Sequence, residues 1–514
     1  MPNTPYPIFS DPRAINEKAD NALATGLAAH FPIENKHYSL ALSDVKVDRK
    51  EFDQKDEKEA ILKSKSLTYP IRGTLSLTHK ATGTVVDTEK DFPLMDSFFL
   101  TGKHTMLYKG NNYIVANQLQ LSPGVFTRTK ENGELEAHFN TQRGRSFSLT
   151  LDPEHELIYL NADKSTSRVL IAPVLTQVFG TSTKEVLQYL PEELWAKNVE
   201  AAKGQEQKSV KALYGQLTSK FKQDKTLSYE DMVVALREAF TGSTLSAMST
   251  AITLGKPFEN ITHETLLRAM ANMVSVRRGD REEDNRDSLQ FKRVQNLPDF
   301  LARRFAAGRE HESVSKVKSR MTFNLERLDH AAPKIRQVIP AKPFNKVYQN
   351  YIMESTLVST PEETNAIESI ENVGKVTVLG AQEGGISDIR AVPKSARNID
   401  ASHTGILDPS RTPESDHAGV DLRFTISAHR DDYGTLYSTV VDNAGKNHIM
   451  SVHDLMTSVV GFPHQEDKAR VQAQDHGVLS EVDRSKVQYW FPSGNSLYTV
   501  TTNLVPFLNS NHPG

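Results

Sequence analysis

The chain has 514 residues, of which 38% are hydrophobic and 24% charged, a balance typical of folded globular proteins. At roughly 150 residues per domain, this length allows two to four domains. Its 61 Lys and Arg against 64 Asp and Glu give a formal charge of −3, which excludes a basic protein that coats nucleic acid non-specifically. The absence of cysteine excludes disulfide frameworks, thiol nucleophiles and cysteine-ligated zinc.

The sequence gives no indication of export or membrane insertion. The N-terminal residues Met1–Thr4 lack the basic and apolar regions of a secretory signal. The longest apolar runs, such as Tyr113–Ala116, are far shorter than the roughly 20 residues that span a bilayer. We therefore expect an intracellular protein with no membrane partner.

Residues 67 to 160 are predicted to form mainly strands. Apolar and polar residues alternate from Ile71 to Leu77 and again from Phe147 to Leu151, which is the period of a strand with one buried face. The run Asp152–His155 then favours a turn. We expect Ser146–Leu160 to form a hairpin that buries one face.

From about residue 181 the apolar spacing changes to that of helices. Ser182 with Glu185 and Ser228 with Asp231 have the spacing of a capping box. One apolar helical face is formed by Val210, Leu213, Tyr214, Leu217 and Phe221. The sequence therefore predicts a helix-rich insert after the strands.

A further helix is predicted to begin near Asn296 and to carry Arg303 and Arg304 outward, because Leu297 and Phe305 belong to its apolar face. Residues 290 to 320 are rich in cations, and a basic ridge is one interpretation. The other is an ordinary solvated helix face. The cations are Lys292, Arg293, Arg303, Arg304, Arg309, Lys316, Lys318 and Arg320.

Beyond about residue 355 the chain becomes rich in Gly, Ser, Asp and Pro, with short β-like runs such as Val376–Leu379 and Leu422–Ile426. This pattern favours long functional loops on a β scaffold. Phosphate-binding, dinucleotide-binding, HExxH and GxSxG motifs are all missing. The carboxylates of Asp280–Asp287 lack the glycine and the ligand order of a calcium loop, so a solvated loop is favoured and no metal site is predicted.

Several segments, in order, resemble landmarks of the β subunit of multisubunit DNA-directed RNA polymerases. Phe92–Met95, Lys109-Gly110 and Val115–Phe126 are similar to the family's PLM, NG and VSQLHRSPGVF. Arg143-Gly144, ahead of Phe147, is similar to its YRGSWLDFEFD hairpin, and Asp287–Val294 resembles DHLGNRRI. The string ending in Ser-Pro-Gly-Val-Phe is specific as a whole, although Ser-Pro-Gly alone is an ordinary turn.

The resemblance continues through the second half of the chain. Asn365–Ile370, with Leu379-Gly380 and Gly384–Ile386, is similar to NPLSEI, LG and GGL. Residues 403 to 419, which include Arg411–Glu414, match the spacing of HYGRVCPIETPEGPNIG. Val487–Tyr489 and Asn503–Leu508 then resemble VDY and SLIPFL. The chain departs from the family at Arg411, where the family has Glu, and at Ser415, where it has Gly.

The resemblance implies an α+β multidomain fold, the N-terminal region of the β subunit. Residues 1–128 are expected to form the first part of the protrusion, 129–285 the helix-rich lobe and 286–354 the second part of the protrusion. Residues 355–425 are expected to form the fork region, and 426–514 the start of the β-rich external region, truncated before the C-terminal half. The protrusion is therefore discontinuous.

The resemblance also implies a non-catalytic part of a nucleotidyltransferase. Its chemistry needs Mg²⁺, which a partner subunit is expected to bind through an Asp triad, so no catalytic residue or metal ligand is expected on this chain. The chain stops after the last landmark, which resembles the split-subunit polymerases of giant bacteriophages. We therefore expect a protein of the infected bacterial host, made there or packaged in the virion.

The expected partners are a polypeptide carrying the C-terminal half of β, β′-like N- and C-terminal polypeptides, a promoter-specificity subunit, template DNA and nascent RNA. The chain is expected to form one pincer of the DNA cleft and to border the RNA–DNA hybrid. A rival interpretation is a structural or virion protein that retains a polymerase-derived fold. The near-neutral charge disfavours a stand-alone nucleic-acid-binding module.

Seven residues are the candidates for contacts with nucleic acid. The phosphate-binding candidates are Arg143, Lys292, Arg293 and Lys375, each with the alternative that it is only solvated or ion-paired. The family positions near the RNA 3′ end and the incoming nucleotide are Arg411, Glu414 and His417. Capping or loop hydrogen bonds are the alternative role for Glu414 and His417.

Overall fold

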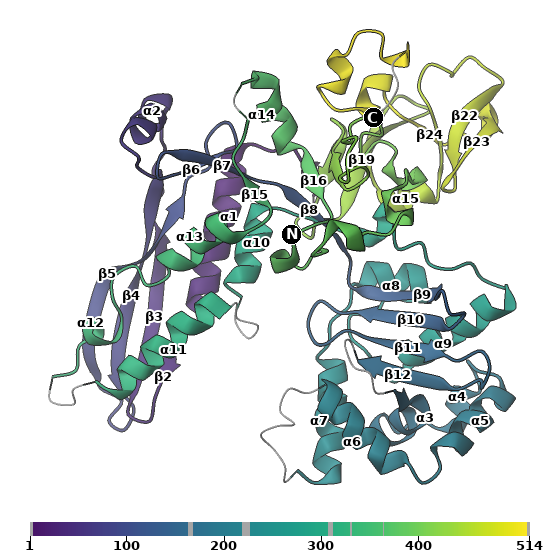
Figure 1. Ribbon diagram of the computed structural model, residues 1–514, viewed down its shortest axis with the longest axis horizontal. Helices are drawn as coiled ribbons and strands as arrows, with labels where there is room; N and C mark the ends of the chain where they lie inside the picture. The colour runs from purple at the N-terminus through teal and green to yellow at the C-terminus, as the bar shows by residue number, and fades with distance from the viewer. Residues whose placement is uncertain are drawn as a thin grey trace. The chain divides into compact units, whose positions relative to one another are not determined.

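The computed structural model describes residues 4–162, 168–217, 227–306, 312–328, 332–362 and 364–510. The chain divides into two compact units (Figure 1). Residues 121–292 form the inserted unit, and residues 1–120 with 293–514 form the main unit. Each unit mixes helices with strands that pair mainly antiparallel, in agreement with the α+β fold expected from the sequence.

The inserted unit is built on a five-stranded antiparallel sheet in the order β13-β12-β11-β10-β9. Its strands are β9 (Gly124–Thr129), β10 (Leu135–Asn140), β11 (Phe147–Leu151), β12 (Ile158–Ala162) and β13 (Val169–Leu170). Its helices are α3 (Ile171–Pro173), α4 (Thr183–Val186), α5 (Glu192–Ala202), α6 (Glu206–Leu217), α7 (Tyr229–Thr241), α8 (Ala247–Leu254) and α9 (His263–Arg278).

The hairpin expected over 146–160 is confirmed as β11 and β12, with Leu149 opposite Leu160. The Asp152 side chain holds the turn by accepting from the amide of Glu154 at 2.9 Å. The expectation of a single buried face was wrong for β11, because all five of its residues are buried. Phe147 stacks on Phe139 at 4.5 Å between ring centroids and meets Phe240 of α7 edge-on at 5.5 Å.

Two helices of the inserted unit, α4 and α7, begin where the sequence predicts. Ser182 and Glu185 form a complete capping box, and the Ser228 side chain accepts from the amide of Asp231. These contacts satisfy amide groups that have no partner inside their own helix. The predicted apolar face of α6 is confirmed at Val210, Leu213 and Tyr214, which are buried, while Phe221 lies outside the described residues.

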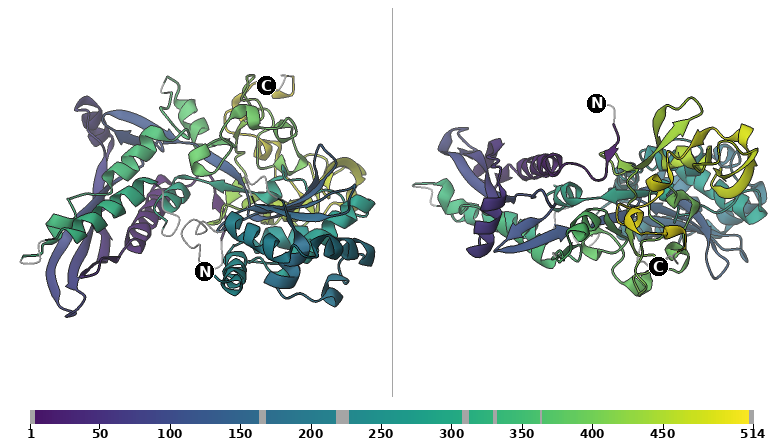
Figure 2. Two further views of the ribbon diagram at one scale, coloured as in Figure 1. Left: turned by 60° about the horizontal axis from the view of Figure 1, so that its bottom comes forward. Right: turned by 90° about the horizontal axis from the view of Figure 1, so that it is seen from above.

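The main unit contains a four-stranded antiparallel sheet in the order β2-β3-β4-β5. The strands are β2 (Ile33–Glu34), β3 (Tyr38–Val47), β4 (Thr68–His79) and β5 (Val85–Phe98). Helices that share its core run beside the sheet in both views of Figure 2. The helices of this region are α1 (Pro12–Ala29), α2 (Gln54–Leu62), α10 (Leu297–Arg304), α11 (Glu312–Glu326), α12 (Ile335–Val338) and α13 (Asn345–Glu354).

Helices α1 and α10 pack closely, although α10 follows α1 by more than 260 residues. A Cβ atom at Gly26 would lie 2.6 Å from Cβ of Phe305, so only glycine allows this approach. Helix α10 begins directly after Asn296, as predicted, and the Asn296 amide donates to the Asp299 side chain at 2.9 Å. The segment after the inserted unit is thereby fixed against the N-terminal helix.

Two further sheets of the main unit are small. One has the order β15-β7-β6, and the other has the order β14-β8-β16-β17. Their strands are β6 (Met106–Tyr108), β7 (Asn111–Val115), β8 (Asn117–Leu121), β14 (Lys292–Gln295), β15 (Val358–Ser359), β16 (Lys375–Thr377) and β17 (Asp421–Arg423), and α14 (Ala366–Val373) precedes β16.

An eight-stranded sheet completes the main unit, in the order β1-β18-β19-β24-β21-β22-β23 with β20 paired to β19. It consists of β1 (Tyr6–Pro7), β18 (Ala428–Arg430), β19 (Leu436–Asp442), β20 (Asn447–Ser451), β21 (Val459–Gly461), β22 (Arg470–Asp475), β23 (Val478–Asp483) and β24 (Tyr489–Trp490), with α15 (Val452–Met456) after β20. Among the described residues, no helix is long and apolar enough to cross a membrane.

Candidate nucleic-acid interface

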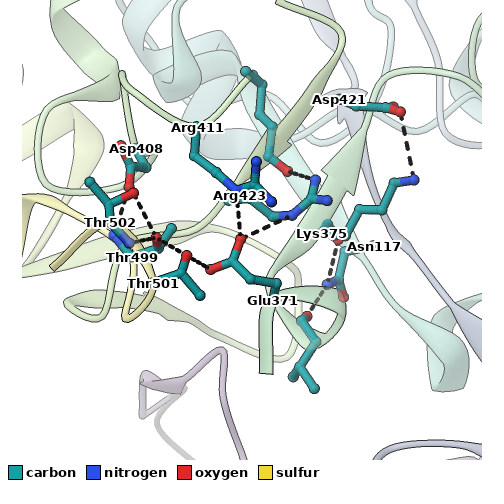
Figure 3. A network of polar contacts seen from close by, with 12 residues as sticks. Asn117, Glu371, Lys375, Asp408, Arg411, Asp421, Arg423, Thr499, Thr501 and Thr502 are labelled. Atoms are coloured by element: carbon teal, nitrogen blue, oxygen red, sulfur yellow. Dashed lines mark hydrogen bonds and ion pairs between the residues drawn. The ribbon is translucent and has the colours of Figure 1, made fainter. Parts of the chain in front are cut away.

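Three of the predicted site residues, Lys375, Arg411 and His417, lie on or beside the sheet that contains β8, β16 and β17. Strand β16 runs parallel to β8 and antiparallel to β17, with Lys375 opposite Arg423. The Asn117 side chain of β8 donates to the carbonyls of Val373 and Lys375, both at 3.0 Å (Figure 3). These bonds fix the junction between α14 and β16.

The centre of the site is Glu371, a carboxylate of α14 with 4% of its surface exposed. Arg411 Nε donates to Glu371 Oε2 at 3.1 Å, and Arg423 Nε lies 3.6 Å from the same oxygen. The Thr501 hydroxyl donates to the other carboxylate oxygen (Figure 3). A buried carboxylate needs such partners, because desolvation of an unpaired charge costs several kcal/mol.

Burial lowers the pKa of the Arg423 guanidinium, and the nearby Glu371 charge opposes that change. The Arg423 side chain is 12% exposed, whereas that of Arg411 is 45% exposed. Two guanidinium groups therefore share one carboxylate, and the more exposed of them faces solvent. This arrangement can offer a positive group to an anion while holding it in a fixed position.

A second group of charges gathers at Asp421 of β17. Lys375 Nζ lies 3.6 Å from Asp421 Oδ2, and His417 Nδ1 lies 3.1 Å from the same oxygen. The His417 side chain is 46% exposed and that of Lys375 is 32% exposed. The structure therefore brings Arg411, His417 and Lys375 together, each ion-paired or hydrogen-bonded to a carboxylate.

The loop from 409 to 420 is held by hydrogen bonds to Arg397 and within the loop itself. Arg397 Nη1 donates to the carbonyl of Asp416 at 2.6 Å, and the amide of Gly419 donates to Thr412 Oγ1 at 2.8 Å. Gly419 has φ +69°, and a Cβ there would lie 2.3 Å from the Arg397 carbonyl oxygen. Glu414 is exposed within this fixed loop.

Asp408, with 1% of its surface exposed, connects the start of this loop to the C-terminal region. Its Oδ2 accepts from the amide of Thr499 at 2.8 Å, and its own amide donates to the carbonyl of Arg423 at 2.9 Å. Residues from three parts of the chain thus meet at one network, drawn in Figure 3.

Two of the candidate phosphate-binding residues belong to the inserted unit. Arg143 is exposed, and its backbone is fixed because its amide donates to Thr244 Oγ1 at 3.2 Å. Lys292 is 18% exposed and lies 3.9 Å from Asp287. Burial lowers the pKa of Lys292, which disfavours its charged form.

Arg293 of the main unit is half-buried, and burial together with the nearby Arg303 charge lowers its pKa to about 10. Its Nε has no hydrogen-bond partner among the residues that the structure describes. Arg293 therefore presents less of its charge to solvent than Arg143 does.

Helix α10 does not carry Arg303 and Arg304 outward, contrary to the expectation from its periodicity. Arg303 donates to Gln120 Oε1 at 2.9 Å and to the carbonyl of Glu383. Arg304 is 5% exposed and stacks over the Tyr351 ring at 5.3 Å. Contacts with distant segments cover this side of α10, and helical periodicity alone does not reveal them.

The basic ridge that was one interpretation of residues 290–320 is therefore not formed as a continuous surface. Arg293, Arg303 and Arg304 are buried or half-buried in this part of the described chain, whereas Lys316 and Arg320 of α11 are exposed. Lys316 is ion-paired with Glu312. Arg309 lies outside the described residues.

The sequence did not indicate Glu371, Arg423 or Thr501 as part of the site. Ile367 and Ile370 of α14 are exposed, whereas Glu371, four positions after Ile367, is buried. Within the described ranges, no group of three or more Asp, Glu or His side chains could hold a metal ion.

The fold and the site thus define a multidomain α+β chain in which a charged loop is anchored on a small sheet. Comparison of its sequence with known proteins indicates its relatives. No protein-family profile matches the chain. It is 24% identical over 527 residues to the DNA-directed RNA polymerase subunit beta of Synechococcus sp. (strain CC9605), covering 95% of this chain and 46% of the relative.

Other curated relatives carry the same name. The β subunit of Parasynechococcus marenigrum (strain WH8102) is 24% identical over 88% of this chain and 43% of the relative. That of Prochlorococcus marinus (strain MIT 9211) is 24% identical over 74% of this chain and 35% of the relative. The comparisons support an N-terminal region of an RNA polymerase β subunit, and the chain spans about half the length of the curated relatives it matches.

Proposed function

We propose that this chain works as part of the β subunit of a DNA-directed RNA polymerase, in a complex that makes RNA on a DNA template. The observation that carries this proposal is the similarity to polymerase β subunits along 95% of the chain. The order of the landmark segments, from Phe92–Met95 to Asn503–Leu508, adds support from the sequence itself.

Within such a complex, we assign the chain one pincer of the DNA cleft and one border of the RNA–DNA hybrid. Around the loop at 409–420, the cations Lys375, Arg411 and Arg423 face the carboxylates Glu371 and Asp421, and the loop itself carries the exposed carboxylates Glu414 and Asp416. Phosphate groups are bound by such fixed cations without reading of the base sequence. The anchored loop would hold Arg411 and His417 toward the nucleic acid.

The chemistry of nucleotide addition is proposed to lie elsewhere in the complex. Two Mg²⁺ ions, held by carboxylates, activate the attacking hydroxyl and stabilise the leaving pyrophosphate in this class of reaction. We assign these ligands to a β′-like partner. The residues of this chain would bind and position template and transcript.

The phage origin and the split-subunit form remain predictions of the sequence resemblance, and the relatives named above are bacterial. The split form requires a separate polypeptide that carries the second half of β, together with two β′-like polypeptides. Purification of the polymerase from its source, followed by mass spectrometry of each subunit, would show how many polypeptides share these sequences.

Reconstitution of the polymerase with and without this chain tests the proposed function. Template-dependent RNA synthesis is expected only when the chain is present. RNA synthesis at the full rate in its absence would contradict the proposal and favour the rival role of a structural protein with a polymerase-derived fold.

A further inference from the structure

Helix α14 exposes two isoleucines and buries a carboxylate. Ile367 and Ile370, one turn apart, are 38% and 45% exposed, whereas Glu371 is 4% exposed. A surface helix ordinarily turns its apolar stripe to the core. Because Glu371 is held inside by Arg411, Arg423 and Thr501, α14 cannot rotate to bury the two isoleucines without losing these partners.

The segment from 500 to 507 is exposed and apolar as well. Phe507 is 82% exposed, Leu504 61%, Val505 41% and Val500 36%. Single exposed apolar residues are common on protein surfaces, but a run of four within eight positions is typical of an interaction site. An exposed Phe is also the kind of residue that anchors protein interfaces.

The same hydrogen-bond network holds both segments. Thr501 lies within the exposed run and donates to Glu371, which directly follows Ile370 in the sequence (Figure 3). Thr499, just before the run, is bound through its amide to the buried Asp408. The residues Ile367, Ile370, Val500, Leu504, Val505 and Phe507, which we call the apolar face, are therefore presented from one anchored part of the main unit.

We propose that the apolar face is a docking surface for the part of a β subunit that this chain does not match. This inference rests on the proposed function. The similarity covers 46% of the length of the first relative, so a comparable length of β-subunit sequence lies outside the match. That part would pack against the apolar face whether it is joined to this chain or is a separate polypeptide.

The chemistry of the face favours protein over nucleic acid as the occupant. None of its six residues is charged, whereas a phosphate backbone is bound mainly by Arg and Lys. The cations of this region, Arg411 and Lys375, belong to the charged site and not to the apolar face. An apolar partner surface would remove the six side chains from water, which favours binding.

Replacement of an exposed apolar residue by a charge tests this docking surface. The polymerase is assembled from its subunits with the full-length chain carrying Phe507→Asp or Ile370→Asp, and binding of the remaining β-subunit sequence is measured by analytical ultracentrifugation. If that sequence is joined to this chain in the native protein, hydrogen exchange of residues 366–373 and 500–507 is compared between the variants and the wild type. Leu62→Asp, at an 85% exposed position of α2, is the matched control.

We expect Phe507→Asp and Ile370→Asp to weaken binding at least tenfold, or to raise exchange in both segments, while Leu62→Asp changes neither measurement by more than twofold. Thermal unfolding of the free chain should stay unchanged, because all three positions are exposed. Binding and exchange equal to wild type would overturn the inference. So would a self-associated chain that the two variants dissociate, because the occupant would then be a second copy.

The two proposals fail in different ways. If the polymerase makes RNA only with this chain but tolerates Phe507→Asp and Ile370→Asp in the binding measurement, the docking surface is wrong and the function stands. If RNA synthesis does not need this chain, the proposed function is wrong, and the docking surface loses the basis for its occupant.

Discussion

Arg411 donates a hydrogen bond to the buried Glu371 across 40 positions of sequence, at 3.1 Å. The bond joins the charged loop at 409–420 to the helix that precedes β16. Because Glu371 also lies near Arg423 and accepts from Thr501, one carboxylate organises three segments of the main unit. The stability of this region and the placement of its loop should therefore depend on the same side chain.

Replacement of Glu371 by Ala should destabilise the main unit. The substitution removes the ion-pair partner of the mostly buried Arg423, and breaking a buried pair in this way costs about 3 kcal/mol. Urea denaturation of the full chain measures the change. Glu326→Ala, at an exposed position of α11, should change the unfolding free energy by less than about 0.5 kcal/mol. Equal effects of the two substitutions would show that Glu371 is not an anchor.

Replacement of Arg411 should lower the rate of RNA synthesis by the assembled polymerase, and this effect should be larger than its effect on the free energy of unfolding. Arg411→Ala removes a half-exposed cation from the loop, and we expect at least a tenfold loss of rate. Arg411→Lys keeps the charge but not the planar guanidinium, so an intermediate rate is expected. Lys316→Ala, which removes an exposed ion-paired cation of α11, serves as the control and should leave the rate within twofold. A normal rate for Arg411→Ala would remove this residue from the site.

Arg143 should contribute to DNA binding through charge alone. If it contacts a phosphate, Arg143→Ala should reduce the slope of log K against log salt for the assembled polymerase by about 0.9, whatever the DNA sequence. Lys197→Ala is the control from the same unit, because Lys197 is 55% exposed and paired with Glu156. An unchanged slope for Arg143→Ala would show that its side chain is only solvated.

For the substitution Gly26→Ala, helix propensity predicts a gain in stability, whereas packing predicts a loss. Alanine in place of a helical glycine ordinarily stabilises by about 1 kcal/mol. Here the added methyl would meet Phe305, so we expect Gly26→Ala to destabilise by about 1–3 kcal/mol in urea denaturation. Thr25→Ala, at the exposed neighbouring position, should not destabilise. A gain in stability for Gly26→Ala would contradict the close packing of α1 on α10.

His104 should make stability depend on pH. Burial lowers its pKa from 6.5 to about 4, so the folded chain keeps it neutral where the unfolded chain protonates it. Between these two pKa values the unfolded state binds more protons than the folded state. The free energy of unfolding therefore has its full value above pH 6.5 and decreases, by up to about 3 kcal/mol, as the pH falls to about 4. His104→Asn, which remains neutral and tolerates the φ of +57°, should flatten this part of the profile. A profile unchanged by the substitution would mean that His104 stays accessible to protons.

Local features of the fold could be predicted from the sequence, and long-range ones could not. Alternation of apolar residues predicted the β11–β12 hairpin, capping residues predicted the starts of α4 and α7, and apolar spacing predicted the start of α10. These features depend on neighbours within a few positions. The burial of β11 on both faces depends on helices that follow it by tens of residues, and its own alternation does not reveal them.

The site shows the same limit. Motif spacing singled out Arg411, His417 and Lys375, which the structure brings together around Glu371 and Asp421. The role of Glu371 was not predicted, because its partners Arg411, Arg423 and Thr501 lie 40 to 130 positions away. The period of α10 misplaced Arg304 for the same reason. Buried charges are fixed by tertiary contacts that a single helical pattern does not encode.

The most direct test of the central claim is the RNA yield of a reconstituted polymerase on a defined DNA template, measured with this chain present, omitted or added back. Polymerase function predicts no RNA above background without the chain and recovery of synthesis when the wild-type chain is restored. Template-dependent RNA made at the same rate in all three reactions would contradict it.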